Sequence, residues 1–182
     1  NGMSQYSRAE FNANSGLVVA IDPARDYPDG PLAGIAFQRH WESQAFVAGG
    51  SSYWAPGQKV GDFLAGRPSA GLGEVIPSYK PGVTMTDLSQ CLPAFAVEAM
   101  REALPVFGRQ ITNYDHPDAV MTGVETRTSS PLRITRGKDF QSLNVERLFP
   151  AGEGAGYAGG ILSAAIDGIK VAEAVAASIM AR

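Results

Sequence analysis

The chain has 182 residues, of which 45% are hydrophobic and 18% charged, enough to bury one sizeable core or one core and a small lobe. A net charge of −3 without a basic stripe excludes nucleic acid as an expected partner. The single cysteine, Cys91, excludes an internal disulfide, and the distant histidines, His40 and His116, lack the spacing of zinc ligands, so no metal site is expected. The polar start predicts no signal peptide, which fits a cytoplasmic protein.

Two elements are predicted in the first fifty residues. Residues 17–21 form a short run rich in β-branched residues that ends at Asp-Pro, which predicts a buried strand. Apolar residues then recur at helical spacing, with Pro31 at the beginning and Gly49 at the end. This pattern predicts a helix over 32–48.

The next stretch, 49–84, is rich in Gly, Pro and Ser. It predicts a long surface excursion, which in many proteins is a lid or a substrate loop. Within it, a short helix is expected over 58–64 and an extended piece over 73–77.

A second helical region is predicted to begin near Asp87, with Thr86 or Asp87 as its N-cap. Pro93 restarts the helix, because proline suits a first helical turn. Pro105 is expected to end it, because proline removes an N–H donor and clashes with the preceding turn.

The C-terminal third predicts strands over 119–124 and 148–152, a short partner strand over 132–134, and a long helix over 160–181. That helix is apolar nearly all round, so we expect it to be buried against a sheet. Charged residues within it argue against a membrane span: Asp167, Lys170 and Glu173.

The most informative stretch is 151–160, in which five of ten residues are glycine. It lies between the apolar run 148–150 and the long helix. Such a cluster allows the backbone to approach something bulky or anionic at a helix N-terminus, where N–H groups lack partners and the helix dipole is positive. A flexible loop and tight helix–strand packing are the alternatives.

Three segments resemble the C-terminal portion of bacterial FAD-dependent dehydrogenases, which are two-dinucleotide-fold flavoprotein oxidoreductases. They are Leu-Phe-Pro-Ala-Gly-Glu at 148–153 with the glycine-rich run to Gly168, Gly-Val-Glu-Thr-Arg-Thr-Ser-Ser-Pro-Leu-Arg-Ile at 123–134, and the asparagines near the N-terminus. The resemblance spans essentially the whole chain. It implies an α/β fold of mixed α+β character, and transfer of hydride or electrons between an unknown small-molecule substrate and flavin.

The resemblance also implies which residues contact FAD. Glu153, where such proteins more usually have Asp, would bind the ribityl chain, and backbone N–H groups at the helix start would face the flavin ring. Arg127, Thr128, Ser129 and Ser130 would lie near substrate or flavin, with Arg133 as a further candidate and an ordinary polar loop as the alternative. No catalytic residue is assigned. The expected cofactor contacts are Gly152, Glu153, Tyr157, Ala158, Gly159, Gly160 and Ile161.

The same resemblance implies a division of the chain. Residues 1–22 would be a strand-containing segment of the FAD domain, 23–118 a largely helical substrate or cap region with long loops, and 119–182 the returning strand and C-terminal helix of the FAD domain. The N-terminal Rossmann glycine motif of such proteins is lacking. We therefore expect the partner to be a missing N-terminal FAD-binding portion of the same protein, with FAD binding weak or absent and no activity in this chain alone. The alternative is a non-enzymatic nucleotide- or anion-binding domain that uses the glycine-rich helix N-terminus.

Overall fold

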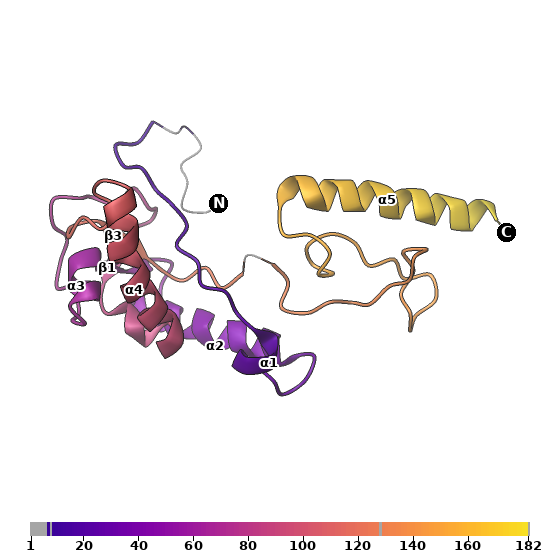
Figure 1. Cartoon of the computed structure of the whole chain (residues 1–182), viewed down its shortest axis with the longest axis horizontal. Coiled ribbons are helices and arrows are strands. Elements are labelled where there is room, and N and C mark those ends of the chain that lie inside the picture. The colour runs from indigo at the N-terminus through magenta and orange to yellow at the C-terminus, as the bar shows by residue number, and fades with distance from the viewer. Residues whose placement is uncertain (1–6, 8, 128, 182) are drawn as a thin grey trace. The chain divides into compact units, whose positions relative to one another are not determined.

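The computed structural model describes residues 7, 9–127 and 129–181. The chain divides into two compact units (Figure 1). Unit 1 comprises residues 1–21 and 39–126, and unit 2 comprises 22–38 and 127–182. Helices and a small mixed sheet together confirm the predicted mixed α and β character.

Unit 1 contains a three-stranded sheet formed by β1 (Ala55–Lys59), β2 (Val83–Met85) and β3 (Val120–Thr122). The central strand β1 pairs in parallel with β2 and antiparallel with β3. Gly57 lies at the middle of β1, where any Cβ would overlap the side chain of Val83. The close approach of these strands therefore requires glycine. The expected strand over 119–124 is confirmed in its centre.

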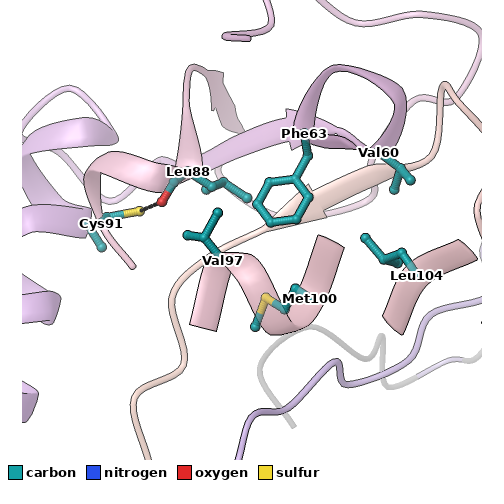
Figure 2. Packing of buried hydrophobic residues seen from close by; sticks show 8 residues of the cluster. Val60, Phe63, Leu88, Cys91, Val97, Met100 and Leu104 are labelled. Atoms are coloured by element: carbon teal, nitrogen blue, oxygen red, sulfur yellow. Dashed lines mark hydrogen bonds between the residues drawn. The ribbon is translucent and has the colours of Figure 1, made fainter. Parts of the chain in front are cut away.

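The core of unit 1 lies among α3 (Val60–Leu64), the 3₁₀ turn η1 (Leu88–Gln90) and α4 (Ala94–Gln110). Figure 2 shows the ring of Phe63 pointing from α3 toward η1 and α4. It is completely buried. The helical period of α4 places its apolar residues on one face against this ring, which explains why the helix forms: Val97, Met100 and Leu104.

Two predictions for this region need correction. The helix α4 does not end at Pro105 but continues to Gln110. Burial of the face that carries Leu104 outweighs the hydrogen bond that proline removes. The expected helix over 58–64 forms only as α3, because residues 58 and 59 belong to β1. The predicted N-cap is confirmed, since Asp87 accepts the backbone N–H of Ser89.

Buried polar side chains connect the sheet to its surrounding loops. The Gln58 amide donates to the Arg67 carbonyl over 2.7 Å and accepts the Leu88 N–H over 2.9 Å. The Asp62 carboxylate accepts the Ser69 hydroxyl and the Arg67 Nε, each over 2.7 Å. These bonds hold the pKa of Asp62 below its ordinary value, with the Ser69 hydrogen bond as the main cause.

The predicted strand over 17–21 does not form among the described residues. Leu17 and Val19 alternate toward the core of unit 1, as a strand would place them, but in the described part of the chain no neighbouring strand bonds to their backbone. The alternating apolar residues thus pack against the core on one side of the segment without forming a strand. The predicted helix over 32–48 is confirmed as α2 (Ala33–Ala48), and a short α1 (Pro23–Asp26) precedes it.

Unit 2 carries the 20-residue helix α5 (Ile161–Met180), preceded by a long irregular segment (Figure 1). The strands expected over 132–134 and 148–152 are wrong for the described residues. Among the described residues of this segment, a single antiparallel bridge forms, between Arg136 and Ser142. Because two bonded backbones must run together over several residues to make a ladder, one bridge leaves the segment irregular.

The predicted burial of α5 is also wrong. Leu162 is 78% exposed, and Val171 is the one buried residue of α5 among those described. The reason is that the described residues of unit 2 form no sheet against which the helix can pack. None of the helices built by the described residues combines the length and apolarity needed to cross a bilayer.

Candidate functional site

The glycine-rich stretch folds as a closed turn that leads into α5. The Tyr157 N–H donates to the Gly152 carbonyl over 3.0 Å, and the Gly156 N–H donates to the Glu153 carbonyl over 2.9 Å. Gly152 and Gly156 both have positive φ, at 68° and 82°. Residues with a Cβ rarely adopt that conformation, so the backbone of the turn favours glycine at both positions. We call residues 150–157 the glycine turn.

An ion pair ties the glycine turn to α5. The Asp167 carboxylate, on the second turn of α5, binds the Arg136 guanidinium through two hydrogen bonds of 2.6 and 3.0 Å. The same carboxylate accepts the Gly152 N–H over 2.8 Å, and Arg136 donates to the Pro150 carbonyl over 2.6 Å. Both side chains are largely covered, with exposed fractions of 8% for Arg136 and 13% for Asp167.

The charge of Arg136 changes the acidity of its partner. Its hydrogen bonds, with the Gly152 N–H as a further contribution, lower the pKa of Asp167 to about 2. The carboxylate is therefore ionised at neutral pH.

The segment around Ser130 runs beside the glycine turn. The Ser130 hydroxyl donates to the Gly154 carbonyl over 3.3 Å, and the Arg133 Nε donates to the Gly156 carbonyl over 3.0 Å. Between them, the Ile134 N–H donates to the Ala155 carbonyl over 3.2 Å. Two groups of candidate residues that lie more than twenty positions apart in sequence are thus adjacent in space.

Tyr157 anchors the turn from within. Its hydroxyl donates to the Ile134 carbonyl over 3.1 Å and accepts the Arg136 N–H over 3.0 Å. Its ring lies beneath the Arg136 guanidinium, with the Arg133 guanidinium 4.9 Å from the ring centroid. The hydroxyl, ring and N–H of Tyr157 therefore all help to hold the shape of the turn.

The helix α5 begins without a side-chain cap, because its N-cap is Gly160. The Gly160 N–H donates to the Ser163 hydroxyl over 3.1 Å. Among the described residues, the N–H groups of Ala158, Gly159 and Ile161 find no acceptor. These backbone donors therefore lie at or just before the positive end of a 20-residue helix.

The remaining candidates are more open. Glu153 is half-buried, while Arg127 and Ser129 are exposed. Gly154 has open space where a Cβ would extend. Thr128 lies outside the described residues.

Sequence reasoning missed the roles of Arg136 and Asp167. The one sequence feature that could have indicated the role of Asp167 is its charge within a largely apolar helix. A carboxylate buried along such a helix needs a cation or backbone donors nearby. Its partners are 15 and 31 positions away, a spacing that no local motif encodes.

The irregular turn at an uncapped helix N-terminus belongs to the class of backbone sites that suit anionic or polarised groups. Residues 1–128 match the family described as "FAD-dependent protein, C-terminal domain-like", and the chain belongs to that family.

A protein of Clostridium beijerinckii (strain ATCC 51743 / NCIMB 8052), described as an uncharacterized protein, is 53% identical to this chain over 173 residues. The match covers 95% of the chain and 32% of the relative. The chain thus spans about a third of the length of that relative.

Proposed function

We propose that this chain supplies the C-terminal part of an FAD site in a longer oxidoreductase. The observation that carries the proposal is the set of backbone N–H groups at Ala158, Gly159 and Ile161, which have no acceptor among the described residues, at the start of α5. Membership of an FAD-dependent family supports the identity of the ligand.

The residues fit FAD on physical grounds. N–H groups without an acceptor and the positive end of α5 suit the carbonyl edge of the flavin ring, which gains negative charge on reduction. Glu153 supplies a half-buried carboxylate suited to the hydroxyls of the ribityl chain. Open space at Gly154 leaves room for a bulky group beside the backbone. When bound, FAD would supply the hydride or electron transfer, while the protein binds and orients it.

The other part of the site would come from a partner segment that carries the Rossmann glycine motif. The exposed apolar residues of α5 support this proposal, since a contiguous exposed apolar face commonly marks an interaction surface: Ile161, Leu162, Ile166 and Ile169. The substrate would be a small molecule, and Arg127 with Ser129 offers a cation and a hydroxyl suited to a carboxylate.

The test uses a hybrid in which this chain replaces the matching third of the Clostridium relative. We expect the purified hybrid to show the absorbance bands of bound flavin, with or without added FAD. A hybrid that folds and still lacks flavin bands after FAD is added would overturn the proposal.

A second measurement separates FAD from other ligands. Melting temperatures of the hybrid are compared with FAD, NAD, ATP and simple organic anions present in turn. FAD is expected to stabilise the hybrid most, and this chain alone is expected to respond weakly or not at all because it holds part of the site. A response to ATP or organic anions without one to FAD would favour a non-enzymatic anion-binding domain.

A further inference from the structure

We infer that Arg136 and Asp167 are positioning residues for the flavin, a conclusion that rests on the proposed function. Neither side chain belongs to the expected contact set. Together they bind both ends of the Pro150–Gly152 segment and hold it against α5.

The geometry makes this connection stiff. The planar guanidinium of Arg136 binds both oxygens of Asp167, and its Nη1 also reaches the Pro150 carbonyl. A bidentate arginine–carboxylate pair fixes orientation as well as distance, which a single hydrogen bond does not. Because Asp167 is part of α5, the position of Gly152 relative to the start of the helix is set by this pair.

Two consequences follow for the site. Glu153 comes directly after Gly152, so its placement depends on the bond between the Gly152 N–H and Asp167. The negative charge of Asp167, close to the positive end of α5, is balanced by Arg136. Loss of either residue would therefore misplace Glu153 and the free N–H groups at the same time.

Misplacement of the donors has a measurable effect on the flavin. Reduced FAD carries more negative charge on its ring than oxidised FAD, so the helix N-terminus would bind the reduced form more tightly. A tenfold loss of this preference lowers the two-electron reduction potential by about 30 mV. If the Arg136–Asp167 pair were purely structural, its loss would lower the stability of the fold without changing the preference for reduced over oxidised FAD.

The experiment compares Arg136→Lys, Asp167→Asn and Asp167→Ala in the hybrid described above. Arg136→Lys keeps the charge but loses the planar fork. Asp167→Asn keeps an acceptor for the Gly152 N–H but loses the charge, and Asp167→Ala loses both. The matched control is Arg67→Lys, because Arg67 pairs with Asp62 in unit 1 over 2.7 Å, far from the glycine turn in sequence.

Each variant is measured for its FAD dissociation constant and the reduction potential of the bound flavin. We expect about tenfold weaker FAD binding for Asp167→Ala, with Asp167→Asn intermediate. We expect a potential lower by about 30 mV for Arg136→Lys, which keeps both charges of the pair, and no change in either quantity for Arg67→Lys. Unaltered FAD binding and potential in the Arg136 and Asp167 variants would overturn the inference. A flavin-free hybrid with no substitution would instead overturn the proposed function.

Hydrogen exchange in this chain alone gives a reading that needs no flavin. The Gly152 amide is expected to exchange at least about tenfold faster in Asp167→Ala than in the unaltered chain, because its acceptor is gone. Equal exchange rates would contradict the tie between the turn and α5, even if Asp167→Ala impaired the folding of the hybrid.

Discussion

Arg136 holds Tyr157 by both its side chain and its backbone. The guanidinium carbon lies 3.7 Å from the ring centroid, and the Arg136 N–H donates to the phenol oxygen over 3.0 Å. A cation over a tyrosine ring is attracted by the negative face of the ring. The glycine turn is therefore supported both by the aromatic side chain of Tyr157 and by the ion pair between Arg136 and Asp167.

The substitution Tyr157→Phe tests how much the Tyr157 hydroxyl stabilises the glycine turn. It removes a hydroxyl that makes two hydrogen bonds, so we expect the free energy of unfolding of the chain to fall by about 1 kcal/mol. Urea denaturation measures this change. The control is Tyr53→Phe, because Tyr53 is 86% exposed and its loss of a hydroxyl should change stability by less than about 0.5 kcal/mol. Equal effects of the two substitutions would contradict the anchoring role.

The glycines of the turn should differ sharply in their tolerance of alanine. At Gly156, φ is positive and a Cβ would lie 2.6 Å from the Leu132 carbonyl, so Gly156→Ala should cost about 2 kcal/mol or more. At Gly154 no atom lies within 4 Å, so Gly154→Ala should be nearly neutral for stability. Thermal unfolding of the chain compares them, and the opposite order would show that the turn has a different backbone.

Acid should weaken unit 2 through Asp167. The folded pKa of about 2 lies below the ordinary value of 3.8, so the stabilisation is fully present above that ordinary value and is lost as the pH falls toward about 2. The melting temperature of the unaltered chain should therefore exceed that of Asp167→Asn at about pH 5, and the gap should narrow toward about pH 2. A gap that does not change with pH would rule out the ion pair as its source.

The exposed face of α5 should matter only when a partner covers it. Leu162→Gln should leave the stability of this chain within about 0.5 kcal/mol, because Leu162 already contacts water. In the hybrid the same substitution should lower the melting temperature and weaken flavin retention. Val171→Ala is the comparison, since Val171 is 6% exposed and its truncation should cost about 2 kcal/mol in both proteins. Loss of stability in the isolated chain from Leu162→Gln would argue that α5 is covered within the chain itself.

Cys91 should be chemically inert while the chain is folded. Burial, with a contribution from Asp87, raises the pKa of its thiol to about 11, so little thiolate forms at mildly alkaline pH. A thiol-reactive dye is expected to react slowly with the native chain and quickly in concentrated guanidinium chloride. Rapid labelling of the native chain would instead mark an accessible, reactive thiol.

Local sequence determined much of the helical structure. The apolar residues of α2 repeat at helical spacing between Pro31 and Gly49, and α5 is a long apolar run that follows Gly160. Both helices form close to the predicted bounds. The side chain of Asp87 caps η1, because a carboxylate two residues before a free N–H needs no distant partner. The glycine turn was likewise visible as a cluster, since positive φ is a property of single residues.

The strands and the supports of the glycine turn were decided by tertiary structure. Leu17 and Val19 have the alternation of a strand, but a strand exists only where a second backbone pairs with it, and a local pattern does not specify that partner. Pro105 remains helical because Leu104 is buried beside it. The sequence by itself determined a turn at the start of a long helix. Only the folded chain brought Arg136 and Asp167 to it, because a pair separated by 31 residues meets through packing and charge rather than through local spacing.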